Sequence, residues 1–126
     1  MGAPTVVVRA DDLIWSTRLV TQLRAAGALP VHVRDAAGFE RALPDAQRAI
    51  VDLTARAYDG VAAVAAAAGA GRRVLAVGQH DDLRLRKAAL AAGAERVYAY
   101  RKLFEDGQAT LERWLGGTLP REQETE

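Results

Sequence analysis

The chain has 126 residues, half of them hydrophobic, which is enough for one domain with a buried core. Its 17 Lys and Arg nearly balance 16 Asp and Glu, and they form no basic stripe that would bind a phosphate backbone, so we expect no direct contact with nucleic acid. The lack of cysteine excludes disulfides, thiolate nucleophiles and Cys-ligated metals. No signal-peptide pattern opens the sequence, and no apolar run reaches the roughly 20 residues of a membrane span, so we expect a cytoplasmic protein without membrane contact.

Short apolar runs alternate with longer segments of helical period along the chain. The first run, residues 5–8, is rich in β-branched side chains and is typical of a strand covered on both faces. The next segment has an Asp cap at 11 or 12 and a glycine stop at 27, which predicts a helix. The same reasoning predicts further strands at 29–33, 49–53, 73–78 and 96–100. It predicts further helices in the segments 60–71, 81–94 and 105–117, and a short helix within 36–47 that stops near Pro44.

Five strands that alternate with five helices predict an α/β fold. Each parallel pair of strands needs a right-handed crossover, so we expect a doubly wound, five-stranded parallel sheet with helices on both faces. In such sheets, ligands bind at the carboxyl ends of the strands, beside the point where the strand order reverses. We expect one domain over residues 1–118 and a polar, disordered tail at 119–126.

Two stretches, "DLTARAYDG" and "AALAAGAERVYAY", resemble the receiver domains of two-component response regulators, which are CheY-like, and the resemblance covers nearly the whole chain. "DLTARAYDG", residues 52–60, resembles the acceptor loop Asp-Leu-x-Met-Pro-x-Met-Asp-Gly. "AALAAGAERVYAY" resembles the passage from helix 4 to strand 5, with Gly93 and Ala94 as its glycine-alanine pair. The resemblance implies a flavodoxin-like three-layer sandwich with strand order 2-1-3-4-5. It also implies Asp52 as the phosphoacceptor, next to the switch point.

The rest of the receiver's phosphotransfer set departs from the family pattern. The acidic pair after strand 1 aligns with Ala10 and Asp11 or with Arg9 and Ala10, although Asp12 could lend a carboxylate if the loop bulges. Gly78 stands at the hydroxyl position and Tyr100 at the lysine position. Lys102 is the better substitute for that lysine, provided that strand 5 continues so far.

Phosphoryl transfer depends on charge neutralisation by a metal ion and a cationic side chain, so these losses bear on function. Asp11 with Asp52 could hold a divalent cation weakly. Arg9 beside Asp52 and Asp11 would instead form an ion pair in the place of the metal. For Asp52 itself, the simplest role is to cap the backbone of its own loop.

The leading hypothesis is a stand-alone receiver-like signalling module, not an enzyme, that works by protein–protein interaction without phosphorylation and requires no cofactor. The alternative is a working, atypical receiver that takes a phosphoryl group on Asp52 from a histidine kinase and needs Mg²⁺. A third hypothesis is a small-ligand sensor that uses the crevice at the strand ends, where Gly78 leaves room near the backbone.

By the same resemblance, the surface of helix 4, strand 5 and helix 5 binds a protein partner or a second copy. Its charged helix faces predict self-association that salt weakens. Trp114 is expected to be buried against helix 1 near Trp15. The predicted interaction residues are Arg84, Arg86, Lys87, Tyr98 and Glu112.

Overall fold

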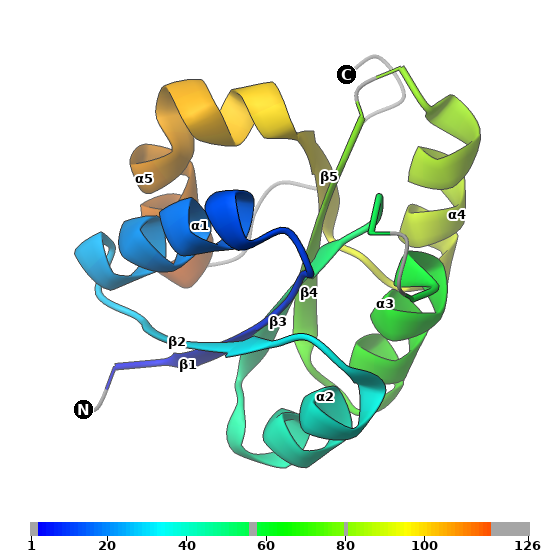
Figure 1. The fold of residues 1–126 in the computed structure, drawn as a ribbon, viewed down its shortest axis with the longest axis horizontal. Helices are drawn as coiled ribbons and strands as arrows, with labels where there is room; N and C mark the ends of the chain where they lie inside the picture. The colour runs from blue at the N-terminus through cyan, green and yellow to red at the C-terminus, as the bar shows by residue number, and fades with distance from the viewer. Residues whose placement is uncertain (1–2, 56–57, 80, 117–126) are drawn as a thin grey trace.

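The computed structural model describes residues 3–55, 58–79 and 81–116. The described residues form a five-stranded, fully parallel sheet in the order β2-β1-β3-β4-β5 (Figure 1). This confirms the predicted fold class and strand order, with the reversal of strand order beside β1 and β3. The strands are β1 (Thr5–Arg9), β2 (Leu29–Val33), β3 (Arg48–Asp52), β4 (Arg73–Gly78) and β5 (Arg96–Ala99).

An aspartate starts each of the first four helices. The side chains of Asp12, Asp35, Asp59 and Asp82 each accept a hydrogen bond from the backbone N–H three residues on, which satisfies one of the free donors of the first turn. The helices are α1 (Leu13–Ala25), α2 (Ala36–Ala42), α3 (Gly60–Gly69), α4 (Leu83–Ala92) and α5 (Tyr100–Gly116), with a short 3₁₀ turn, η1 (Leu43–Asp45), after α2.

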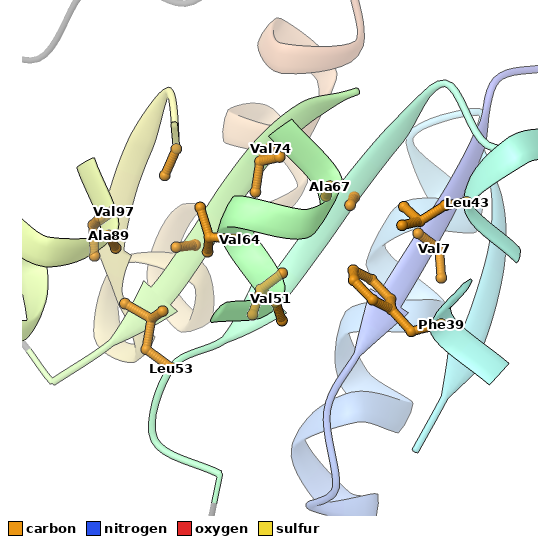
Figure 2. Close-up of a cluster of buried hydrophobic side chains, with 14 of the residues drawn as sticks. Val7, Phe39, Leu43, Val51, Leu53, Val64, Ala67, Val74, Ala89 and Val97 are labelled. Carbon is orange, nitrogen blue, oxygen red and sulfur yellow. The ribbon is translucent and has the colours of Figure 1, made fainter. Parts of the chain in front are cut away.

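The helices cover both faces of the sheet. Figure 1 shows α1 and α5 together on one face and α2, α3 and α4 on the other. Because side chains alternate between the two faces of the sheet along a strand, the strands contribute side chains to two cores. One core packs Val6, Val8 and Ile50 against α1 and α5. The other packs residues such as Val7 and Val51 against α2, α3 and α4, and Figure 2 shows its labelled side chains, which include Phe39, Leu43, Val64 and Val97.

Strand β5 and helix α5 differ from the predicted boundaries. The strand ends at Ala99 and the helix begins at once at Tyr100, although a strand to residue 100 and a helix from 105 were expected. Ion pairs at i, i+4 from Arg101 to Glu105 and from Lys102 to Asp106 stabilise this additional helical turn.

A kink at Asp106, with φ −143° and ψ 33°, separates this turn from the rest of α5. At the kink, Nε2 of Gln22 in α1 donates to the carbonyl of Leu103 at 2.8 Å. Gly107 makes room for this contact, since a Cβ there would lie 2.4 Å from the same nitrogen. This bond, and a second from Nη2 of Arg18 in α1 to the carbonyl of Phe104 at 3.3 Å, attach the first turn of α5 to α1.

No helix within the described ranges is long and apolar enough to cross a membrane. The predicted tail at 119–126 lies outside the described residues.

Candidate functional site

Asp52 is the last residue of β3, and its side chain is only 4% exposed. Its Oδ1 accepts hydrogen bonds from the backbone N–H and the hydroxyl of Thr54, both at 3.0 Å, and from the hydroxyl of Tyr100. All hydrogen bonds to this carboxylate from the described part of the chain go to Oδ1. The second oxygen, Oδ2, accepts none from those residues. Oδ1 is thus fully hydrogen-bonded, whereas Oδ2 remains available to a ligand in the crevice that Asp52 lines.

Tyr100 stands where the family resemblance expects a lysine. As the first residue of α5 it follows β5 directly, and its ring meets Trp15 edge to face, with centroids 5.1 Å apart. Burial raises the pKa of the Tyr100 hydroxyl, and the hydrogen bond to Asp52 raises it further. The side chain beside Asp52 is therefore a neutral donor rather than a cation, and it also shares a hydrogen bond with the Thr54 hydroxyl.

An open crevice of about 530 Å³ lies over this group at the carboxyl ends of the strands. Asp11, Asp12 and Asp52 line it with carboxylates, and Asp12 also caps α1 through a 2.8 Å hydrogen bond from the Trp15 N–H. The structure thus brings the three predicted acidic residues to one crevice. Its other described lining residues are Trp15, Thr54, Ala55, Gln79, Tyr100 and Phe104, so that none of them is Lys or Arg.

These carboxylates do not converge on one point. Among residues 3–55, 58–79 and 81–116, no three His, Asp or Glu side chains are close enough together to hold one metal ion. Binding of Mg²⁺ between Asp11 and Asp52 therefore stays a prediction, and any such ion would have to take most of its ligands from water.

The expected ion pair between Arg9 and Asp52 is wrong. Arg9 pairs in register with Val51, so its side chain leaves the sheet on the face of α2 and α3, whereas Asp52, one residue further on, leaves on the face of α1 and α5. Arg9 is 4% exposed and lines a second cavity, of about 280 Å³, between α2 and α3. Ala10 is buried in the core under α1 and does not line the crevice either.

Tyr58, which was not predicted as a site residue, fixes the ends of two strands. Its hydroxyl lies 2.6 Å from the carbonyl oxygen of Arg9 and 2.7 Å from that of Asp52. Its ring is 3.9 Å from Cζ of Arg9, a cation–π contact. Burial, and next the charge of Asp52, raise the pKa of the Tyr58 hydroxyl. The signal for Tyr58 was its position in the acceptor-loop pattern, directly before Asp59 and Gly60.

Gly78 and Lys102 do not take the roles considered for them. A Cβ at Gly78 would face Leu53 at 3.5 Å, an ordinary contact, and the residue is not among those found to line the crevice. Lys102 lies in α5 rather than in β5, and its Nζ pairs with Asp106 at 3.3 Å. The condition for Lys102 to replace the family lysine, a strand that continues to residue 102, is therefore not met.

The predicted interaction residues lie on α4, β5 and α5, but they are not equally available. Arg84 and Lys87 are exposed, whereas Arg86 is half-buried and donates from Nη1 to the carbonyl of Val97 at 3.1 Å. Tyr98 is half-buried under the Arg96 guanidinium, at 5.4 Å from its ring centroid. Glu112 is exposed and accepts from Gln108 at 3.1 Å within its own helix.

Trp114 is buried, as expected, but not beside Trp15. Its Nε1 donates to Glu95 at 2.8 Å, and it lies near Arg48 and Arg73, the first residues of β3 and β4. Trp15 is in the first turn of α1, at the opposite end of the sheet, where it contacts Tyr100. Of the two tryptophans, only Trp15 therefore lines the crevice.

Comparison with solved structures finds the same fold in response-regulator receivers, whereas no family model and no curated protein matches the sequence. The signal receiver domain of NarL from Mycobacterium tuberculosis has a TM-score of 0.76 at 23% identity, with 93% of this chain and 99% of that chain covered. A response regulator from Thermotoga maritima has a TM-score of 0.77 at 13% identity, with 91% and 99% covered. At these identities the comparisons establish the fold.

A third structure of the same fold contains a modified aspartate and bound groups. A response regulator from Burkholderia pseudomallei, with a phosphorylated aspartic acid, a calcium ion and citrate, has a TM-score of 0.74 at 17% identity, with 90% of this chain and 69% of that chain covered. This chain thus has the fold of receiver domains. Whether it also shares their function depends on the residues of its own site.

Proposed function

We propose that this chain is a receiver-like signalling module that acts by binding a protein partner, without phosphorylation of Asp52. It is a binding module rather than an enzyme and requires no cofactor. The fold and the acceptor-loop residues Asp52, Asp59 and Gly60 support the receiver part of the proposal.

The observation that carries the proposal is the hydrogen bond from the Tyr100 hydroxyl to Asp52. A receiver needs a cation and a metal ion around the incoming phosphoryl oxygens, because catalysis there is charge neutralisation and positioning. In this crevice a neutral phenol stands in the lysine position and already binds one oxygen of the acceptor. No described lining residue is Lys or Arg, so nothing among them compensates for the lost lysine.

Partner binding is proposed for the surface of α4, β5 and α5, as the family resemblance implies. The exposed cations Arg84 and Lys87 on α4 support this assignment, because complementary charge guides association. The acidic side chains near the start of α5 contribute less, since Glu105 is paired with Arg101 and Asp106 with Lys102. The surface therefore presents net positive charge on α4, which suits an acidic partner or an acidic face of a second copy.

The alternative, a working receiver that accepts phosphate from a histidine kinase, has one observation in its favour. Oδ2 of Asp52 accepts no hydrogen bond from any described residue, and a free carboxylate oxygen is what attacks a phosphodonor. Under this alternative Mg²⁺ is required, with Asp11 and Asp52 as its carboxylate ligands.

Incubation with Mg²⁺ and acetyl phosphate, followed by intact mass measurement, distinguishes the phosphorylation-independent module from a working receiver. We expect the unmodified protein to gain no phosphoryl group, and the same for Asp52→Asn. We expect partial phosphorylation of the double variant Gly78→Thr with Tyr100→Lys, which restores two family positions; a Cβ at Gly78 would make only an ordinary contact with Leu53, at 3.5 Å. Stoichiometric phosphorylation of the unmodified protein that Asp52→Asn abolishes would overturn the proposal and establish the alternative.

A further inference from the structure

The crevice over Asp52 combines negative charge with aromatic walls. Its described lining carries the carboxylates of Asp11, Asp12 and Asp52 and no Lys or Arg, and the rings of Trp15, Tyr100 and Phe104 complete it. The volume of about 530 Å³ lies within the range of about 300–1,000 Å³ that is usual for small-molecule sites. Carboxylates attract cations, and the rings add apolar surface, although one face of Phe104 is already covered by the Arg18 guanidinium at 4.2 Å from its centroid. The complementary ligand is therefore a cation with apolar parts.

The spacing of the carboxylates distinguishes between kinds of cation. They line one crevice, yet no three acidic or histidine side chains of the described residues come close enough to share one metal ion. A compact divalent ion would neutralise one end of the crevice and leave the remaining charge unmatched. A longer molecule with several positive groups can pair with carboxylates at separate positions.

Asp52 provides an acceptor at the base of the crevice. It is 4% exposed, its Oδ1 is saturated by Thr54 and Tyr100, and its Oδ2 accepts nothing from the described residues. An ammonium or guanidinium N–H of a ligand would give Oδ2 the charge-assisted hydrogen bond that no described residue supplies.

The aromatic residues come from two elements that meet at the crevice. Trp15 in the first turn of α1 packs edge to face on Tyr100, and Phe104 follows one turn later in α5, half-exposed. Methylene groups between two ammonium groups would lie against these rings, while the charged ends reach the carboxylates. An inorganic ion would leave this apolar surface in water.

We propose that the crevice binds a small organic cation with two or more ammonium or guanidinium groups, of which an aliphatic polyamine is the simplest. The inference rests on the proposed function, in which neither Mg²⁺ nor a phosphoryl group occupies the crevice. One positive group hydrogen-bonds to Oδ2 of Asp52, a second pairs with Asp11 and Asp12 at the rim, and the chain between them contacts Trp15 and Phe104.

Calorimetric titration of the protein with spermidine in low salt tests the proposal. We expect binding of one molecule per chain, and we expect Asp52→Asn to weaken it by about tenfold or more, because a charge-assisted hydrogen bond is lost. Asp12→Asn should weaken it less, and Asp35→Asn not at all. The last two variants are matched, since both aspartates cap a helix, asparagine caps equally well, and both remove one negative charge, but only Asp12 lines the crevice.

Three outcomes would overturn the proposal. The first is no detectable binding. The second is binding that Asp35→Asn weakens as much as Asp52→Asn does, which would mean general attraction to an acidic surface. The third is displacement of spermidine by an equal concentration of Mg²⁺, which would make the crevice a metal site. The acetyl phosphate experiment is independent of all three, so failure of the ligand proposal leaves the question of phosphorylation unaffected.

Discussion

The hydroxyl of Tyr100 donates a hydrogen bond to Oδ1 of Asp52, across the carboxyl end of β4. Asp52 ends β3, and Tyr100 follows β5, so the contact joins the two strands on either side of β4. The same hydroxyl meets Thr54 Oγ1, and the ring packs on Trp15. A single side chain therefore connects the acceptor position, the loop after β3 and the start of α1.

Replacement of Tyr100 by phenylalanine should lower the free energy of unfolding by about 1–3 kcal/mol, because Oδ1 of a buried carboxylate loses a donor. The ring contact with Trp15 survives in this variant, so Tyr100→Ala should lower stability further. Urea unfolding at neutral pH measures both. Equal stability of Tyr100→Phe and the unmodified protein would show that the hydrogen bond contributes nothing.

Alkaline pH should destabilise the protein through its tyrosines. The pKa values of Tyr58 and Tyr100 are raised by burial in the folded state, whereas the unfolded chain has ordinary values near about 10. Above that pH the unfolded state loses protons that the folded state keeps. The contribution of the two tyrosines to the free energy of unfolding is therefore complete below about pH 10 and is lost as the pH rises beyond it. Urea unfolding between pH 8 and 11 should show this slope, and Tyr58→Phe and Tyr100→Phe should each reduce it. A slope unchanged in both variants would contradict the assignment.

The sequence predicted the sheet well because its signals are local or periodic. The β-branched run at 5–8, the aspartate caps at 11 or 12 and at 81 or 82, and the glycine stop at 27 are local signals that need no tertiary information. The side of the sheet on which a residue emerges depends instead on where each strand ends. An error of one residue reverses it, which is why Arg9 was expected beside Asp52 and lies on the other face.

The crevice was predicted only in part for a similar reason. Asp11 and Asp12 follow β1 and Asp52 ends β3, so their position along the chain was enough to find them. Phe104 was missed in the crevice because its place depends on the early start of α5. Tyr58, which lines the second cavity, was missed because its contacts depend on the path of a loop. No pattern in the sequence indicates that the helix begins at Tyr100 rather than after residue 104.

Substitution of Arg9 by methionine tests the corrected position of this side chain. Its Nη1 is buried and has no hydrogen-bond partner, so an apolar side chain of similar length should leave the free energy of unfolding within about 1 kcal/mol or increase it. Arg9→Lys should be worse than Arg9→Met, because it keeps a buried charge and loses the planar contact with Tyr58. Affinity for Mg²⁺, measured by titration, should not change. A marked rise would mean that Arg9 does neutralise Asp52.

Substitution of the two glycines at the ends of α3 distinguishes a steric requirement for glycine from an effect of helix propensity. At Gly60 a Cβ would lie 2.8 Å from the Cα of Leu53, too close for any side chain, so Gly60→Ala must move the backbone next to Asp52. We expect a loss of about 1–3 kcal/mol. At Gly69 a Cβ would meet nothing within 4 Å, and Gly69→Ala should be neutral or stabilising by up to about 1 kcal/mol. Thermal unfolding measures both, and similar effects of the two would contradict the packing argument.

Self-association should depend on the exposed cations of α4. Arg84 and Lys87 are exposed, whereas Arg86 is bonded to the Val97 carbonyl and its loss would disturb the fold itself. We therefore expect sedimentation velocity at low salt to detect a concentration-dependent dimer, which added salt weakens by screening and which Arg84→Glu with Lys87→Glu weakens further. The control reverses Arg24 and Arg41, exposed residues on α1 and α2, and changes the net charge equally. A monomer across the micromolar range, or a dimer that the control weakens as much as the α4 variant does, would reject α4 as part of the interface. If only the α4 variant dissociates, its cations must meet carboxylates of the second copy, because exposed ion pairs act at contact distance and are otherwise worth little.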